Sequence, residues 1–529
     1  MTTLRTSIGP ALAGLLGAVA VSLGLALAGP SPALAQEPKA GDAPADLSLA
    51  IQRVTLDNGL RVVLNVDRTS PSVAVAVTYN VGSRNEQRGR SGFAHLFEHM
   101  MFQGSKNAPR GEHLRLISGH GGILDGNTTP DRTSYFESVP ANELALALWL
   151  EADRMKSLDV SAESFETQRR VVQEEYRQGV SNAAYAQSAI RLEELVFQGY
   201  WPYEHNTIGS MADLDGARFE WARDFFAAHY GPDTAVLTVS GDFQAEEALA
   251  LVRKYFDGVP RIGAAELGDT PFPEQTSQRT AVVKDDSARA PGVLYGWPTP
   301  PMAHADRHAL EIAALLLGDG ETSRLRQLLV RDRALAQGVS AALEVRRGPG
   351  LFTIDARLTA DARVGDVERL IEGEIRALST RGPSDAELAR ARRRARAAFV
   401  FGLQRNVARA LSLSEYELFL GDARRINGEL GRYLAVTKQD VQRVAREHLG
   451  PLRRTIVETY PSDAPAGPPR ALKAAPVAAH PGGGRGDAAK KAGAPHGKKG
   501  DKAAGDKPAP KGKAGAKPKG KAGAKPKKK

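Results

Sequence analysis

The chain has 529 residues and contains no cysteine. Disulfide bonds and thiolate metal sites are therefore excluded, so a zinc site would have to use histidine and carboxylate side chains. A lipid anchor on a cysteine behind a signal peptide is excluded for the same reason. Beyond the first 28 residues, the sequence also lacks an apolar run long enough to span a bilayer.

The first 35 residues have the pattern of a secretory signal peptide. Arg5 provides a positive start, residues 11–28 are a mainly apolar run, and Ala33-Leu34-Ala35 supplies small residues before a cut ahead of Gln36. We therefore expect residues 1–35 to direct export, which makes the protein periplasmic or secreted. The apolar run is long enough that an uncleaved membrane anchor is the alternative.

The formal charge of +10 comes from the last part of the chain. Residues 481–529 hold 15 Lys and 1 Arg against 3 Asp, a balance of +13, which leaves −3 for the rest. Residues 463–529 are rich in Lys, Ala, Gly and Pro and cannot bury a core, so we expect a disordered basic tail. The tail is either a solubilising extension or an electrostatic contact to a polyanion.

The body between these ends is too long for one core and repeats the same kind of strand and helix pattern. After a polar linker over 36–50, residues 54–64 predict a β-hairpin around Asp57-Asn58-Gly59. Strands are expected at 72–79, 132–138, 234–240, 281–283, 292–295 and 454–458, and helices at 142–158, 161–179, 219–230, 305–317, 322–334, 363–379, 384–401, 409–420 and 437–448. The prediction is an α+β protein of two homologous domains, 51–260 and 261–462, each a β-sheet with helices packed on one face.

The segment His95-Leu96-Phe97-Glu98-His99 carries the clearest chemistry. Ser91-Gly92 can start a helix, and residues four apart on a helix share one face, so His95 and His99 can bind one metal ion from the same side. Glu98 lies beside them, within reach of a water at that metal. The order His-x-x-Glu-His is the inverzincin zinc signature. The alternative is a pair of core histidines bonded to backbone carbonyls beside a buried ion pair.

A third protein ligand is expected elsewhere, because two histidines alone do not make a strong zinc site. Glu175 follows Val171 and Val172 at helical spacing, so we expect it on the buried face of its helix. Glu174 is rotated by about 100° and is expected to face solvent. An ion pair between Glu175 and an arginine is the alternative, and the adjacent residues 193 and 194 (both Glu) are weaker candidates for the ligand.

The second half contains a similar pair, His304 and His308, at the matching place in the repeat. Arg307 occupies the position that corresponds to Glu98, so no carboxylate stands where catalysis would need it. Since two prolines precede the pair, we expect an exposed, solvated helix start, where Asp306 could at most join a surface site.

The chain from about Val54 to Tyr460 resembles the pitrilysin-type inverzincin metallopeptidases, the group that includes insulysin and the mitochondrial processing peptidases. The resemblance is carried by short segments in one order: Thr55-Leu56-Asp57-Asn58-Gly59-Leu60, Gly82-Ser83-Arg84, His95 to His99, Met101-Phe102-Gln103-Gly104-Ser105, Gly121-Gly122, Asp131-Arg132-Thr133-Ser134-Tyr135, Gln168 to Glu175, Tyr203 to Gly209, Gly241-Asp242 and Leu317-Gly318-Asp319-Gly320. Many segments in the right order are far more specific than one motif.

The resemblance implies a zinc peptidase in which two chains close as a clamshell around a peptide. His95, His99 and Glu175 fall on the ligands of one Zn²⁺ per chain, and Glu98 falls on the general base. Gln168 stands where several members carry a second glutamate that supports the site, and Asp125 stands where an asparagine often follows the Gly-Gly pair.

Active members of this group also use an arginine and a tyrosine from the opposing half to hold the substrate and stabilise the transition state. By alignment these positions are Val330 and Gln337, although Arg331 or Arg333 could substitute in a shifted register. We therefore expect a homodimer, or a heterodimer with a zinc-free homologous chain that supplies the arginine and the tyrosine.

The leading hypothesis is a zinc endopeptidase that acts on peptides or unfolded polypeptides, with Glu98 as general base. An edge strand would bind the peptide as an added strand, and the strand leading to Tyr135 is the candidate, with Asp125 and Tyr135 as substrate contacts. The alternative is a non-catalytic scaffold or subunit of a peptidase-like heterodimer, with which the missing arginine and tyrosine agree. A third hypothesis is a polyanion-binding protein that acts through its basic tail.

Overall fold

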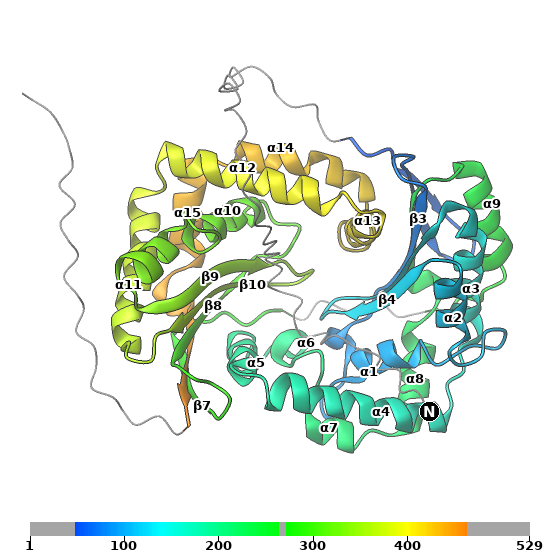
Figure 1. Ribbon diagram of the computed structural model, residues 1–529, viewed down its shortest axis with the longest axis horizontal. Helices are drawn as coiled ribbons and strands as arrows, with labels where there is room; N and C mark the ends of the chain where they lie inside the picture. The colour runs from blue at the N-terminus through cyan, green and yellow to red at the C-terminus, as the bar shows by residue number, and fades with distance from the viewer. Residues whose placement is uncertain (1–47, 264–270, 463–529) are drawn as a thin grey trace, which may run out of the picture. The chain divides into compact units, whose positions relative to one another are not determined.

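A computed structural model describes residues 48–263 and 271–462 of the chain. The predicted signal peptide 1–35, most of the linker 36–50 and the basic tail 463–529 lie outside the described residues. In the described ranges, none of the helices is both long and apolar enough to cross a membrane. The described residues all belong to one compact unit, and most of its helices and several of its strands are labelled in Figure 1.

The first sheet has six strands in the order β1-β2-β6-β3-β5-β4. Their bounds are β1 Gln52–Thr55, β2 Arg61–Val66, β3 Ser72–Tyr79, β4 Ile123–Thr128, β5 Thr133–Pro140 and β6 Ala235–Gly241. The predicted hairpin is confirmed, since β1 pairs antiparallel with β2. Strand β6 returns from the far end of the first half to pair with β2 in parallel and with β3 antiparallel. Strand β4 was not predicted, and it forms the edge of the sheet beside β5.

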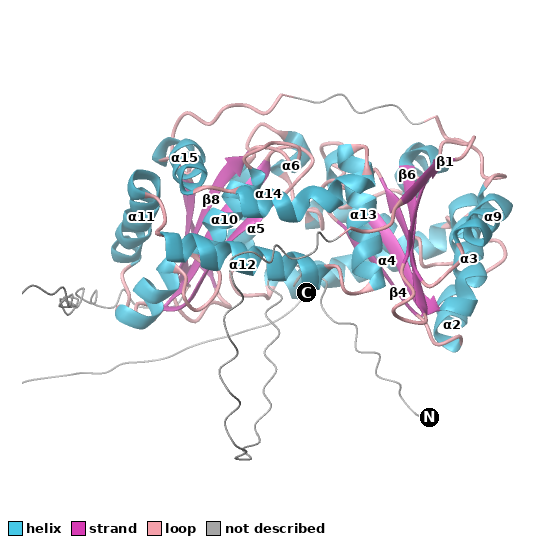
Figure 2. Cartoon of the chain, turned by 90° about the horizontal axis from the view of Figure 1, so that it is seen from above, coloured by secondary structure: helices cyan, strands magenta, loops and turns pink. Residues whose placement is uncertain are grey.

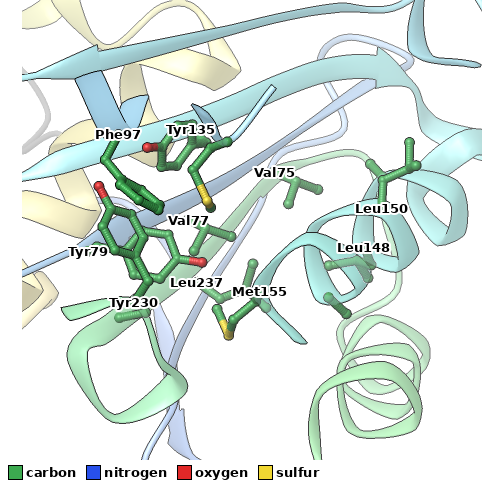
Figure 3. Packing of buried hydrophobic residues seen from close by; sticks show 14 of the residues in the cluster. Val75, Val77, Tyr79, Phe97, Tyr135, Leu148, Leu150, Met155, Tyr230 and Leu237 are labelled. Atoms are coloured by element: carbon green, nitrogen blue, oxygen red, sulfur yellow. The ribbon is translucent and has the colours of Figure 1, made fainter. Parts of the chain in front are cut away.

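Among the described residues, the first half contains the four predicted helices, at the histidine pair and at 142–158, 161–179 and 219–230, and five that the sequence did not predict. Their bounds are α1 Phe93–Met100, α2 Glu112–Gly119, α3 Leu144–Ser157, α4 Ala162–Tyr176, α5 Ala186–Val196, α6 Trp201–Glu204, α7 Met211–Asp215, α8 Phe219–His229 and α9 Ala245–Phe256. The core between the sheet and these helices is apolar: Val75 and Val77 of β3 meet Leu148 and Met155 of α3 (Figure 3). The apolar side of α1 enters this core, which fixes the helix that carries the histidine pair.

The second sheet repeats the order of the first. Strands β7 Arg279–Asp285, β8 Gly292–Thr299, β9 Ala336–Glu344, β10 Gly350–Leu358 and β11 Thr455–Pro461 follow the order β7-β11-β8-β10-β9. This order corresponds to β2-β6-β3-β5-β4 of the first sheet. The helices are α10 Arg307–Leu317, α11 Val364–Arg381, α12 Asp385–Gly402, α13 Asn406–Leu420, α14 Glu429–Ala435 and α15 Lys438–His448, and the predicted helix 322–334 is a π-helical segment over Arg326–Asp332. The predicted α+β fold with two sheets is thus confirmed.

Each sheet carries helices of its own half on one face, and a helix from the other half packs on the opposite face. Residues of β3 alternate between the two faces: Val75 and Val77 face the core with α3, whereas Ala74 and Ala76 pack with Ala410 of α13. Figure 2 shows α13 on one side of the first sheet and α3 and α9 on the other.

The second sheet receives α5 in the corresponding way. Leu192 and Val196 of α5 cluster with Val457 of β11. A side chain at Gly296 of β8 would lie only 2.9 Å from both Leu192 and Val196, so glycine is needed for this close approach. Each half thus covers one face of the other half's sheet, and the predicted division between residues 260 and 261 stays a prediction.

Candidate metal centre

Helix α1 holds the histidine pair rigidly. Phe93, Leu96, Phe97 and Met100 are at most 2% exposed and anchor the helix in the first core. The helix begins after Gly92, whose φ of 91° is in the left-handed region that favours glycine, and Gly92 makes no side-chain cap. The Ser91 hydroxyl, which could have capped the helix, donates instead to Asp213.

The predicted ligands converge. Glu175 Oε2 on α4 lies 3.7 Å from His95 Nε2 and 3.4 Å from His99 Nε2. The three ligand atoms lie within 4.8 Å of one another. Nitrogen and oxygen ligands of a tetrahedral zinc, each about 2.1 Å from the metal, lie roughly 3.4 Å apart. The spacing of these three side chains therefore fits a zinc ion bound between α1 and α4.

The surroundings of the three side chains shift their pKa values in different directions. Burial, reinforced by the neighbouring His99, lowers the pKa of His95 to about 4, so His95 is the neutral imidazole that a metal requires. Burial lowers the pKa of His99 as well, but the hydrogen bond and charge of Glu175 outweigh it and raise that pKa. Burial opposes ionisation of Glu175, whereas the two histidines favour it and lower its pKa overall. Glu175 is thus held as a carboxylate against the histidine pair.

Glu98 faces strand β4. The Thr128 hydroxyl donates to Glu98 Oε2 at 2.5 Å. A side chain at Gly126 would lie 3.1 Å from Glu98 Cγ and 3.0 Å from a ring carbon of Phe102, so this part of β4 rests on the carboxylate. Burial raises the pKa of Glu98; the Thr128 hydrogen bond and His99 oppose this, and Asp125 and Glu175 add to it. A carboxylate with a raised pKa is a stronger base.

The supporting residues fall partly where they were predicted. Gln168, on α4 and 6% exposed, forms a side-chain hydrogen bond with His99. Asp125 is exposed on β4, and its role in substrate contact stays a prediction. Tyr135 does not fit its predicted role: it is 0% exposed and packs in the core against Tyr79 (Figure 3). Its ring also contacts Phe102. Its strand β5 lies between β3 and β4, so the prediction of an edge strand there is wrong.

The two valines that predict a buried Glu175 differ in exposure. Val172 is buried, but Val171 is 37% exposed, so Glu175 lies at the border of the buried face. Glu174 is 56% exposed and pairs with Arg177, as predicted for the solvent side. The two weaker candidates do not reach the site, because Glu193 pairs with Arg346 and Glu194 with Arg191.

The second histidine pair does not form a solvated helix start. His304 is 47% exposed, but His308 is buried and bonds to Glu429 at 2.7 Å, beside the Arg307–Glu429 ion pair. Asp306 is also buried and is bound by Arg443 and His448 rather than lying on the surface. These groups neutralise one another inside the second half, a long-range arrangement that local spacing cannot reveal.

The alignment positions for the missing arginine and tyrosine lie just before β9 and at its start. Val330 lies in the π-helical segment, and Gln337 is exposed at the beginning of β9. Arg331, which could have substituted, is 58% exposed and forms an ion pair with Glu321 at 2.6 Å.

A further buried group was not predicted. His113, Glu137 and Glu151 come within ligand distance of one another, but Arg154 forms an ion pair with Glu151. His113 Nε2 lies 2.5 Å from Glu137 Oε1. Arginine supplies the positive charge here, so this group is an ion-pair network under the sheet rather than a second metal centre.

Comparison with known proteins identifies the family. A model described as "Insulinase (Peptidase family M16)" matches residues 61–201, and one described as "Peptidase M16 inactive domain" matches residues 219–395. The zinc protease PqqE of Helicobacter pylori is 30% identical over 422 residues, 78% of this chain and 93% of that protein. The chain belongs to peptidase family M16.

Other M16 proteins agree with this assignment. An uncharacterized zinc protease of Mycobacterium tuberculosis, Rv2782c, is 29% identical over 417 residues, 77% of this chain and 93% of that protein. The crystal structure of a protease from Helicobacter pylori is similar with a TM-score of 0.75 and 28% identity, and the match covers 78% of this chain and 100% of that one. The resemblance seen in the sequence is thus confirmed, and the zinc named in these M16 relatives agrees with the geometry of His95, His99 and Glu175.

Proposed function

We propose that the chain is a zinc metalloendopeptidase that hydrolyses peptides or unfolded polypeptides. The observation that carries this proposal is the convergence of His95, His99 and Glu175 from two helices, with Glu98 beside them under β4. A structural ion pair would need one histidine at most, whereas two imidazoles and one carboxylate at zinc spacing form the ligand set of a hydrolytic site that leaves a position open.

In this proposal His95, His99 and Glu175 hold one Zn²⁺, which when bound polarises a peptide carbonyl and acidifies water. Glu98 accepts a proton from the attacking water and donates it to the leaving amine. Thr128 fixes the Glu98 carboxylate by its 2.5 Å hydrogen bond. Gln168 orients the His99 ring through its side-chain hydrogen bond.

Strand β4 is the place where the peptide binds in this proposal, in the role first assigned to β5. β4 has one strand partner in the described sheet, and its inner face rests on Glu98. An extended peptide that pairs with the free side of β4 would continue the sheet and bring its backbone past Glu98. Because this mode reads backbone groups, it accepts extended chains and excludes folded proteins. Asp125 would then contact the side chains of that peptide.

A second chain completes the site in this proposal. The alignment positions Val330 and Gln337 supply neither a cation nor a phenol. A heterodimer with a zinc-free homologous chain would bring an arginine and a tyrosine to the substrate, whereas a homodimer closed as a clamshell would have to use Arg331 or Arg333 in a shifted register. Export by residues 1–35 to the periplasm or the outside of the cell, and a polyanion contact through residues 463–529, are further parts of the proposal that rest on sequence alone.

The competing function is a non-catalytic scaffold or subunit. The match of residues 219–395 to a model described as an inactive domain favours this alternative, as does the absent arginine and tyrosine pair. Intact ligands and an intact base at zinc spacing favour the enzyme.

One matched pair of variants and one single variant test the proposal. Glu175→Gln is expected to lose the stoichiometric zinc, whereas the adjacent exposed Glu174→Gln keeps it, as measured by metal analysis after dialysis. Glu98→Gln is expected to keep zinc and to lose nearly all cleavage of a quenched peptide, assayed alone and with a candidate partner chain. Zinc retention in Glu175→Gln, or turnover in Glu98→Gln, would refute the assignment. Zinc without cleavage in the unsubstituted chain under both conditions would favour the scaffold.

A further inference from the structure

The start of helix α1 is held by a residue that the proposed chemistry does not use. Glu86 lies in the loop before the helix, and its side chain is 0% exposed. Its Oε2 accepts the backbone N–H of Gly92 at 2.9 Å, and its Oε1 accepts that of Ala94 at 2.7 Å. These N–H groups of the first turn have no partner within the helix, and Gly92 has no side chain to bind them. Glu86 therefore replaces the missing N-cap and adds negative charge at the positive end of the helix.

Glu86 is in turn bound by His205, and the surroundings of that ring determine its charge. His205 Nε2 lies 3.0 Å from Glu86 Oε2 and 3.0 Å from the Ser83 carbonyl, while His205 Nδ1 lies 2.9 Å from the Trp201 carbonyl. Carbonyl and carboxylate oxygens only accept hydrogen bonds, so both ring nitrogens have to donate. A neutral imidazole has one donor, and only the imidazolium satisfies all these partners.

The neighbouring groups support a charged ring at this position. The ring stacks on Trp201 with centroids 4.0 Å apart and an interplanar angle of 16°. The Trp201 indole N–H donates to the backbone carbonyl of Glu86 at 2.6 Å. Burial raises the pKa of Glu86, and His205 and the two N–H groups of α1 oppose that rise.

This arrangement matters for the metal because the ligands come from separate helices. His95 and His99 lie one and five residues beyond Ala94, which Glu86 binds directly. Glu175 belongs to α4, so the distances of 3.7 and 3.4 Å between its oxygen and the two imidazoles depend on where α1 is fixed. A shift of the first turn of α1 would separate the ligands that a zinc ion has to bind together.

We infer that Glu86 and a protonated His205 form a buried ion pair that clamps the first turn of α1 and so sets the zinc affinity of His95, His99 and Glu175. This inference rests on the proposed metal centre. Glu86 and His205 are positioning residues in this account, since neither side chain is placed at the metal or the substrate.

The test measures zinc binding rather than turnover. Glu86→Gln and His205→Gln are expected to weaken zinc binding on the order of tenfold or more, because mutations of groups that orient metal ligands have effects of this size. Competition with a chelator measures the zinc affinity. The double variant is expected to lose no more than the worse single variant, because the two side chains act as one unit. His229→Gln is the matched control, since this histidine lies on α8, which also packs against α1, and among the described residues it forms no hydrogen bond or ion pair with Glu86. Affinities within twofold of the unsubstituted chain in folded variants would overturn the inference.

A second measurement decides the case where the variants fail to fold. Nitrogen NMR of the unsubstituted protein labelled in its histidines is expected to show His205 as an imidazolium at pH 7. The signal is assigned by its loss in any soluble His205→Gln material, or by its contact with Trp201 protons. A neutral His205 at pH 7 would refute the clamp. If the unsubstituted chain binds no zinc, the proposed metal centre fails, and the charge of His205 still decides whether the ion pair exists.

Discussion

Gly126 is the position where the smallest change should have a large effect on the proposed chemistry. It lies on the inner face of β4, directly over the base. A Cβ atom at this position would lie 3.0 Å and 3.2 Å from two ring carbons of Phe102 and 3.1 Å from Glu98 Cγ. Non-bonded carbon atoms prefer separations of about 3.5–4.0 Å. Gly126→Ala therefore requires a movement of roughly half an ångström between β4 and the Glu98 side chain.

The expected effect of Gly126→Ala on activity depends on whether Phe102, Glu98 or the strand moves. Phe102 is packed by Tyr135 and by the Arg154 guanidinium, so the Glu98 side chain or the strand has to yield. A misplacement of about 1 Å in a catalytic geometry costs about 100-fold, so half of that displacement is expected to lower kcat/KM about tenfold. Zinc affinity is expected to stay within about twofold, because the new methyl group contacts neither imidazole. The free energy of unfolding is expected to change by less than about 1 kcal/mol, since alanine also reduces the freedom of the unfolded chain.

The assay compares two glycine to alanine changes. Gly119→Ala, at the end of α2, is the control, because a Cβ there meets nothing within 4 Å among the described residues. Cleavage of a quenched peptide, metal content and urea unfolding are measured for both variants. A Gly126→Ala protein with unchanged kcat/KM, or a loss that Gly119→Ala shares, would refute the close contact of β4 with the base. Loss of zinc in Gly126→Ala would show that the effect passes through the ligands instead.

Three further changes probe other parts of the structure. Burial raises the pKa of Glu137 from 4.5 to about 7, partly opposed by Arg154, so the folded state keeps a proton that the unfolded chain loses. The stability that this proton provides is full below pH 4.5 and is lost as the pH rises through 7, and the loss is at most about 3 kcal/mol. Glu137→Gln mimics the protonated form, so we expect it to be more stable than the unsubstituted chain at pH 8 and equally stable at pH 4.5. Urea unfolding with chelator present measures this difference. Thr128→Val removes a hydrogen bond to a charged group and is expected to lower kcat at least tenfold without changing metal content, which a stopped assay and metal analysis check. Leu413→Ala, buried where α13 meets the first sheet, is expected to cost about 2–5 kcal/mol of unfolding free energy, against less than about 1 kcal/mol for Leu434→Ala at a site that is 38% exposed.

The elements that could be predicted are those in which apolar residues recur with the period of a strand or a helix. Strand β3 was predicted over its observed bounds, because valine alternates with smaller residues along it. Strand β4 has the sequence Ile-Leu-Asp-Gly-Asn-Thr, which is rich in poor strand formers. It is extended because β5 pairs with it and its inner face rests on α1. Without β4, the edge of the sheet was assigned to β5, and a core tyrosine was assigned to substrate binding.

The site divides in the same way between local and long-range information. His95, Glu98 and His99 lie within five residues, so their spacing indicates a metal site, and the flanking segments in the right order make that prediction specific. Glu86 and Thr128 reach this helix from other segments, and no spacing pattern links them to it. One signal was available: Gly92 offers no side-chain oxygen at the start of the helix, so the cap had to come from elsewhere.

The exchange of α5 and α13 between the halves has a consequence for how the protein can be divided. A cut between the two sheets would leave each fragment with one bare apolar face, formed by Ala74 and Ala76 in the first sheet and by Val457 in the second. The first fragment would contain α5, which covers the second sheet, and the second fragment would contain α13, which covers the first sheet. Folding of the metal-binding half is thus tied to synthesis of the other half, and separately produced fragments are expected to aggregate alone and to recover solubility only when made together.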